Sequence, residues 1–406
     1  MLRRWYPILA LWLVGVLAAA QLAKVSSIAP LLRERFGLSL PATGLLISLL
    51  EVGGGLFGFV AGLALGRIGC RRSLIAGMVV LTAASFIEAL ASGPRLWFAA
   101  RAAEGIGYLL AVIAAPTAIA AVASDRQRSR ALALWSCFVP VGVAIGGMAT
   151  GLIVAVSGIA AVLWLWTGLL AAATLATARL PMVDAADRRI VLPARAAWIS
   201  TFAFGMYTLF VCALTMLLPT FLVEQRGATV AAAGLIAGVA SLSALPGTVF
   251  AIMTLRGRRL PPWRLVMVAA PALIATALLS ALSFRPGLGS LASGGVALLA
   301  IMLGGLVAPL VFARLPDQAG AQHPHDPRIA TANGLLTQFG AGGALIGPPL
   351  GGLIARNWGW EALGFAIGAM ALAMLATTAL AELAALSSRA DADADAADDA
   401  DADAAR

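Results

Sequence analysis

Residues 7–32 read PILALWLVGVLAAAQLAKVSSIAPLL, an apolar run long enough to cross a membrane as a single helix. Within this run stands Lys24, the only lysine of the chain, whereas the other basic residues apart from two histidines are all arginines. Placing a cation at that depth costs about 2.5–3.5 kcal/mol on insertion scales, so intramembrane lysines usually have a function. We therefore expect Lys24 to belong to the functional site.

The composition extends this expectation to the whole chain. Of the 406 residues, 61% are hydrophobic and only 12% are charged, and the mean hydropathy is +0.94. No soluble domain of this length has such a composition. No alternating ten-residue pattern of a membrane barrel occurs, so the spans are predicted to be helices. Twelve spans are expected, at residues 7–32, 41–65, 73–93, 95–123, 130–154, 159–181, 197–222, 229–255, 264–284, 289–313, 329–355 and 359–385.

The arginines predict the orientation of these spans. Twenty of them fall at segments on the same side as the N-terminus, and six fall in the opposite loops. The positive-inside rule then places both termini in the cytoplasm. This bias also accounts for the net charge of +9, so the charge implies basic loops facing an anionic leaflet and no nucleic-acid partner. The first span resembles a secretory signal, but its removal would break the alternation of the arginines, so we expect it to be retained.

An internal repeat divides the chain into two halves. When residues 131–153 are aligned with residues 332–354, nine of 23 positions are identical, including one phenylalanine and three glycines. We therefore predict two six-helix bundles at residues 1–183 and 197–388. A cytoplasmic linker at residues 184–196 would join them, and a disordered tail rich in alanine and aspartate would follow at residues 389–406.

Two motifs in the N-terminal half resemble those of the major facilitator superfamily. Residues 62–72 read GLALGRIGCRR, which is similar to the loop signature G-x-L-x-D-R-x-G-x-R-R, and residues 101–107 read RAAEGIG, which is similar to the element R-x-x-x-G-x-G. The resemblance implies an all-α fold of twelve transmembrane helices in two pseudo-symmetric bundles. It also implies a gating role for the cytoplasmic loop, carried by Gly62, Gly66, Arg67, Gly69, Arg71 and Arg72. Gly66 stands where the family has aspartate, which puts that role in doubt; a purely topological role for the arginines is the alternative.

Small residues and prolines cluster in the fifth and eleventh spans. They permit close helix approach and kinks that allow a bundle to rock, although tight packing alone is an equally good interpretation. The residues in question are Pro140, Gly142, Gly146, Gly147, Gly347, Pro348 and Pro349.

Five ionisable residues lie within the spans of the N-terminal half. Counted from the turn between their spans, Lys24 and Glu51 have similar depths and could pair. Glu88 and Arg101 also have similar depths, and we expect them to form a structural pair. Glu104 lies at i+3 from Arg101 on the same helix face. The C-terminal spans are expected to offer only Gln338 and Asn333 as polar groups at depth, which would leave an apolar wall opposite the charges.

These ionisable residues, together with nearby polar residues, are the candidates for a transport site. Proton coupling is expected to involve Glu51, Arg101 and Glu104, with Glu51 the leading candidate, and substrate binding to involve Lys24, Gln21, Ser27 and Gln338. The alternative for Lys24 is that its long side chain reaches outward to the membrane surface. His323 and His325 are too few ligands for a metal site, no phosphate-binding loop occurs, and the three cysteines have no paired spacing, so neither a metal nor another cofactor is expected.

The predicted function is secondary active transport by alternating access. Within the superfamily the sequence is loosely similar to cyanate-permease-like and drug-efflux carriers of bacteria. The arginine-rich, lysine-poor composition and the short loops are typical of a bacterial inner membrane, and we expect a monomer. A cation among polar residues favours a small anionic or carboxylated solute, moved with protons. An apolar C-terminal half would instead favour export of hydrophobic, drug-like compounds. A membrane sensor or scaffold of the same fold is the third possibility, and no spacing of nucleophile and base suggests an enzyme.

Overall fold

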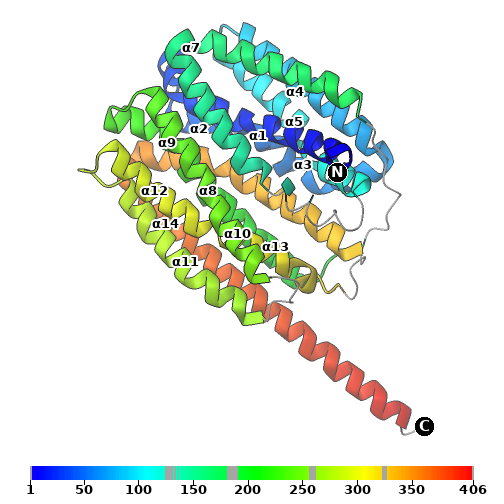
Figure 1. Cartoon of the computed structure of the whole chain (residues 1–406). Helices are drawn as coiled ribbons and strands as arrows, with labels where there is room; N and C mark the ends of the chain where they lie inside the picture. Colours follow the sequence, from blue (N-terminus) through cyan, green and yellow to red (C-terminus); the bar gives the residue numbers. More distant parts are fainter. Residues whose placement is uncertain are drawn as a thin grey trace.

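The computed structural model describes residues 2–123, 131, 134–135, 137–180, 191–255, 262–321 and 327–404. All elements among them are helices (Figure 1). Those of the N-terminal half are α1 (Leu2–Phe36), α2 (Leu40–Ser48), the 3-10 turn η1 (Leu49–Glu51), α3 (Val52–Ile68), α4 (Cys70–Leu90), α5 (Pro94–Val122) and α7 (Phe138–Ala178). Those of the C-terminal half are α8 (Arg195–Arg226), α9 (Val230–Leu242), α10 (Ala244–Leu255), α11 (Pro262–Ser283), α12 (Ser290–Gly304), α13 (Val307–Gln318) and α14 (Pro327–Ala404).

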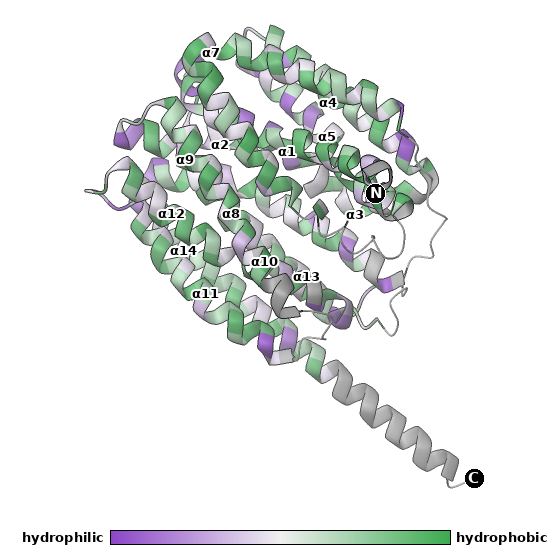
Figure 2. Ribbon diagram, viewed as in Figure 1, coloured by the Kyte–Doolittle hydropathy of each residue, from purple (hydrophilic) through white to green (hydrophobic). Residues whose placement is uncertain are grey.

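Ten stretches of the described helices are long and apolar enough to cross a membrane. Hydrophobic residues predominate along them, as the green colouring of Figure 2 shows. Two of the stretches, in α7 and α14, contain a glycine whose positive φ breaks the helix: Gly158 with φ 77° and Gly359 with φ 87°. Because the 41 residues of α7 would extend about 60 Å as one helix, twice the hydrocarbon thickness, each of the two holds more than one span. The exact number of twelve spans stays a prediction.

The internal repeat is visible in how the two halves pack. In each half, two glycines at corresponding positions let a long helix touch the first helix of the same bundle, α7 against α1 and α14 against α8. A Cβ added at any of the four would collide with a backbone carbonyl oxygen; the pairs are Gly142 with Val16, Gly146 with Ala20, Gly343 with Gly205, and Gly347 with Leu209. The same contacts recur in both halves, which supports the predicted duplication.

The two halves also meet through a repeated contact. Gly147 of α7 lies against Gly234 of α9, and in the second copy of this arrangement Gly44 of α2 lies against the carbonyl of Pro348 in α14. Small residues thus bring the backbones of opposite halves together. These contacts are what close packing of the glycines would produce, while the roles of the glycines and prolines in packing and rocking stay predictions.

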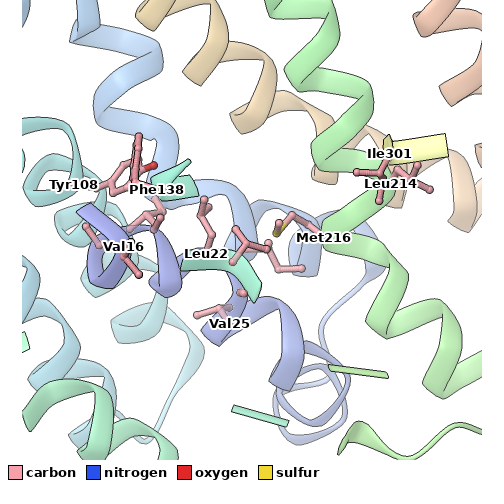
Figure 3. Close-up of a cluster of buried hydrophobic side chains, with 14 of the residues drawn as sticks. Val16, Leu22, Val25, Tyr108, Phe138, Leu214, Met216 and Ile301 are labelled. Atoms are coloured by element: carbon pink, nitrogen blue, oxygen red, sulfur yellow. The ribbon is translucent and has the colours of Figure 1, made fainter. Parts of the chain in front are cut away.

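One hydrophobic cluster runs through both halves. Val16 and Leu22 of α1 pack near Tyr108 and Phe138, and Met216 projects from α8 toward α1 (Figure 3). The first helix is thereby held from both sides. Its members Ala23 and Val25 flank Lys24 in the sequence, and Leu50 precedes Glu51.

The ends of the halves differ in part from the prediction. Residues 181–190 of the predicted linker lie outside the described residues, and α8 begins at Arg195, inside the range assigned to the linker. The tail at residues 389–406 was expected to be disordered, but α14 continues as a helix to Ala404. The alternation of alanine with aspartate explains the difference, because alanine has the highest helix propensity of all residues.

The close glycine packing can be tested at two adjacent positions. We expect Gly343→Ala to destabilise the protein by about 1–3 kcal/mol, as overpacking does, because the new methyl group would press on the Gly205 carbonyl. Gly342→Ala is the control, since a Cβ there meets no atom within 4 Å. Thermal unfolding in detergent would measure both, and equal melting temperatures would contradict the packing.

Candidate functional site

The second membrane span is interrupted at mid-depth. α2 ends at Ser48, the 3-10 turn η1 follows, and α3 begins at Val52, so the interruption falls on Glu51. A 3-10 turn pairs each N–H with the carbonyl three residues earlier, which frees carbonyl oxygens at the end of the preceding α-helix. In hydrocarbon those oxygens need partners within the protein.

Arg101 of α5 supplies these partners. Its Nε donates to the carbonyl oxygen of Leu46 at 3.3 Å and its Nη2 to that of Ile47 at 3.1 Å. The same Nη2 donates to the carbonyl oxygen of Gln21 in α1 at 2.9 Å. The guanidinium group therefore joins α1, the interrupted second span and α5. Gly105, from the second family-like motif, lets α5 approach, because a Cβ there would stand 2.5 Å from the Leu49 carbonyl oxygen.

Four fully buried charged side chains form a network next to this interruption. Lys24 Nζ donates to Glu88 Oε2 at 2.6 Å and to Glu104 Oε1 at 3.1 Å, and Arg101 Nη1 donates to the other oxygen of Glu104. All four side chains have 0% exposure. We call Lys24, Glu88, Arg101 and Glu104 the charge network. Its two positive and two negative formal charges cancel, as burial in an apolar bundle requires.

The predicted pairings were partly wrong. The expected Arg101–Glu104 contact at i+3 is confirmed. Lys24, however, binds Glu88 and Glu104 and not Glu51, and Glu88 binds Lys24 and not Arg101. Lys24 does not reach the membrane surface either, because its side chain is fully buried. Residue counting placed Lys24 about 13 and Glu88 about six residues from the outer turns, so neither their depths nor the helix rotations led to the contact that the two side chains make.

Glu51 differs from the network in having no partner. Its side chain is 8% exposed, and it makes no hydrogen bond or ion pair within the part of the chain that the structure describes. The following turn meets the C-terminal half directly: a Cβ on Gly54 would stand 2.5 Å from Cβ of Ala341, and one on Gly55 3.2 Å from Cα of Gly342. Glu51 is therefore an unpaired carboxyl at a helix interruption next to the bundle interface.

The predicted substrate-binding residues contact different elements. Gln21 Nε2 donates within α1 to the Leu17 carbonyl oxygen, and its Oε1 is buried without a hydrogen-bond partner. Ser27 Oγ donates to the carbonyl oxygen of Gly147 in α7 at 3.4 Å. Gln338 Oε1 accepts from the backbone N–H of Phe59 in α3 at 3.1 Å, so Gln338 crosses the bundle interface. The structure does not gather these three around the Lys24 ammonium group.

The predicted gating loop is a tight turn. Gly69, with φ 89°, is the single residue between α3 and α4, which accounts for a glycine at this position. Arg71 Nη2 donates to the carbonyl oxygen of Ala178 at the end of α7 at 3.0 Å, and Arg72 is exposed. Gly62 is exposed as well, with no atom within 4 Å of an added Cβ. The environments of Gly66 and of the Arg67 side chain lie outside what is described, and the gating role stays a prediction.

A second buried charge cluster contradicts the expectation that the C-terminal spans hold no charges. Arg314 of α13 donates from Nε to Glu382 Oε1 at 2.9 Å and from Nη2 to Glu382 Oε2 at 2.6 Å, a bidentate contact with α14. Gln318 and Asp317 complete the cluster, at 2.8 Å from Glu382 and Arg314 respectively. Sequence reasoning assigned Arg314 to a loop because it ended the tenth span at residue 313, whereas α13 continues to Gln318. Glu382 inside the last apolar run was a signal that could have revealed it.

Within the described residues, no group of three histidine, cysteine or acidic side chains could hold a metal ion. His323 and His325 lie outside these residues. Two apolar grooves lie on the outside of the N-terminal bundle, one between α1 and α7 and one between α4 and α7. Neither includes a member of the charge network.

The described chain thus has an all-helical membrane fold with a repeated half and a buried charge network. The sequence model of the Major Facilitator Superfamily matches residues 11–326. The chain therefore belongs to this superfamily.

Solved structures of the same fold agree. A bacterial homolog of the human lysosomal transporter Spinster, in an inward-facing and unoccupied conformation, matches with a TM-score of 0.73 and 16% identity, covering 95% of this chain and 98% of the other. A mutant form of the nucleoside transporter NupG matches with a TM-score of 0.71 and 12% identity, covering 92% of this chain and 99% of the other. At such identities the likeness concerns the fold alone. None of the curated proteins compared matches the sequence.

The charge network can be tested with a double-mutant cycle. We expect Lys24→Met and Glu88→Gln each to lower the stability by about 3–5 kcal/mol, because each leaves an uncompensated buried charge. The double variant should recover part of that loss, since its formal charges cancel again. Thermal and denaturant unfolding in detergent would measure the three variants.

The control is Arg33→Gln. The ion pair of Arg33 with Glu224 is partly exposed, at 32% and 23%, so its loss should cost about 0–1 kcal/mol. Additive effects of the two network substitutions would show that Lys24 and Glu88 do not interact.

Proposed function

We propose that the protein is a proton-coupled secondary transporter in which Glu51 carries the proton. The observation that supports this is the contrast between Glu51 and the charge network: three buried carboxyl groups lie close in the N-terminal bundle, and only Glu51 has no cation bound to it. A buried carboxyl group with no cation beside it holds a proton, and it can release that proton when a cation takes its place. Such a group can alternate between the two.

The position of Glu51 supports coupling to conformational change. It ends the 3-10 turn, and the next turn touches α14 of the other half at Gly54 and Gly55. Rocking of one bundle against the other would change the surroundings of this carboxyl, as alternating access requires. Arg101 and Glu104 would then support the coupling indirectly, since Arg101 holds the carbonyl oxygens of the interrupted helix that presents Glu51.

Binding of the anionic solute predicted from Lys24 requires an ammonium group whose charge is not already neutralised by carboxylates. Both carboxyl groups within reach of Lys24 already bind it, whereas Glu51 has a negative charge to offer when it is deprotonated. We therefore infer that the geometry favours an organic cation, or a largely apolar solute, that competes with the proton for Glu51. Proton-driven export of hydrophobic compounds was the alternative function, and this arrangement suits it.

The membrane location, the orientation and the oligomeric state of the protein are also part of this proposal. We propose that both termini lie in the cytoplasm, because of the distribution of the arginines between the two sides, and that the membrane is a bacterial inner membrane, because of the arginine-rich composition and short loops. The monomeric state also stays a proposal. A non-transporting sensor of this fold would be indicated by solute binding without any transport in vesicles.

Neutralising Glu51 should separate coupling from transport. We expect Glu51→Gln to abolish accumulation driven by a pH gradient in proteoliposomes, because the amide cannot release a proton, and to preserve solute exchange between equal compartments at solute concentrations that saturate its weakened site. Glu104→Gln is the comparison, and it should mainly lower the unfolding temperature, because Arg101 and Lys24 would lose a shared partner. If Glu51→Gln still concentrates solute under a pH gradient alone, the assignment of Glu51 fails.

The sign of the solute charge can be tested directly. A thermal-shift screen of the purified protein should show stabilisation by organic cations and not by organic anions of similar size. The apparent affinity for these cations, derived from the thermal shift, should be at least about tenfold lower in Glu51→Gln. This factor is equivalent to about 1.4 kcal/mol for a lost charge contact. Stabilisation by anions alone, abolished in Lys24→Met, would restore Lys24 as the binding residue.

A further inference from the structure

A long apolar groove lies on the outside of the N-terminal bundle. It has a volume of about 910 Å³ and runs between α1 and the part of α7 that follows Gly158. Leu9 and Leu13 line one wall and Leu169, Ala172 and Ala176 line the other. The three leucines are 39–50% exposed, so the protein itself does not cover the groove.

The length of the groove matches one leaflet of a bilayer. On α1 its lining begins at Tyr6 and ends at Leu17, and along α7 it begins at Leu169 and ends at Leu180, just past the end of the helix. Eleven residues of helix extend about 16 Å, which is half of the ~30 Å hydrocarbon thickness. The groove therefore has the length of one extended acyl chain and stops near the bilayer centre.

The polar end of the groove is basic and aromatic. Tyr6, which is 64% exposed, stands at this end on α1, and the exposed Arg179 caps the C-terminus of α7 next to Leu180. Arg71 is exposed nearby and donates to the Ala178 carbonyl oxygen. Aromatic residues settle at the membrane interface, and arginine binds phosphate oxygens through its fork of donors.

We propose that this groove binds an anionic phospholipid of the cytoplasmic leaflet, with one acyl chain between α1 and α7 and the phosphate at Arg179. The proposal rests on the proposed orientation and is independent of the transport proposal. The cytoplasmic leaflet carries the anionic lipids, and each arginine near such a surface contributes about 1 kcal/mol. A bound chain would fill the space between α1, which carries Lys24, and the outer helix of its bundle.

The second groove provides a matched control. It has a volume of about 650 Å³ and lies between α4 and α7, lined by Ala83 and Phe86 among others. On α7 its lining ends at Leu175, short of Arg179. It is therefore equally apolar, but its lining on α4 begins only at Val79, so no arginine is the chain neighbour of a lining residue as Arg179 is of Leu180 in the first groove.

Native mass spectrometry of the delipidated full chain can test the site with two defined lipids, phosphatidylglycerol and phosphatidylcholine. The parent protein should retain one phosphatidylglycerol in preference to phosphatidylcholine. Ala172→Trp should abolish this retention by filling the groove, and Arg179→Gln should weaken it about fivefold, equivalent to about 1 kcal/mol. Ala83→Trp should leave it unchanged.

Two outcomes would overturn the proposal. Equal retention of both lipids by the parent protein would show an ordinary boundary lipid only. Unchanged preference in both Ala172→Trp and Arg179→Gln would place any specific lipid elsewhere. Arg179→Gln changes one exposed side chain at a helix end, so it keeps the test decisive even if Ala172→Trp does not fold.

Discussion

Arg101 is the residue on which the arrangement of the N-terminal bundle depends. A guanidinium group in hydrocarbon must find acceptors within the protein, and an interrupted helix there must find donors. Arg101 meets both needs, since it donates to the freed carbonyl oxygens of Leu46 and Ile47 and to the Glu104 carboxylate. Because it also binds the Gln21 carbonyl in α1, the interruption, the first helix and α5 are fixed to one another.

This constraint explains why neighbouring carboxyl groups have different roles. Glu88 and Glu104 neutralise Lys24 and Arg101, and their burial at 0% exposure fits a structural part of the site. Glu51 belongs to the interrupted segment that Arg101 supports, but it takes no part in the network. The network of paired charges thus lies beside a carboxyl group without a cation, and this contrast is the reason for proposing Glu51 as the group that exchanges protons or solute.

Much of the fold could be predicted from the sequence, because lipid permits few structures. Apolar run length, arginine bias and two motifs predicted an all-helical fold of the superfamily, which the family match confirms. The glycine repeat also predicted close helix packing, which Gly142 and Gly343 show at corresponding positions. Both rest on one-dimensional rules of length, charge and residue size.

The site was less predictable, for a geometrical reason. Counting residues from a turn suggested that Lys24 and Glu51 are level, but the tilt and rotation of each helix and the 3-10 turn at Glu51 decide which neighbour each side chain faces. Arg314 was missed for a related reason: one additional helical turn moved it from an expected loop to a buried contact with Glu382.

The distribution of strong and weak contacts favours rocking of intact bundles. Within the bundles, buried ion pairs such as Lys24–Glu88 and Arg314–Glu382 would each cost about 3–5 kcal/mol to break by removal of one partner. Between the bundles, the described polar contacts include single hydrogen bonds, from Ser26 Oγ to the Met216 carbonyl and from Phe59 N–H to Gln338, each worth about 0.5–1.5 kcal/mol. Small residues such as Gly55 and Gly342 meet there without interlocking side chains. The contacts beside Glu51 are thus weaker than those within the bundles, which fits the proposed coupling of this carboxyl to rocking.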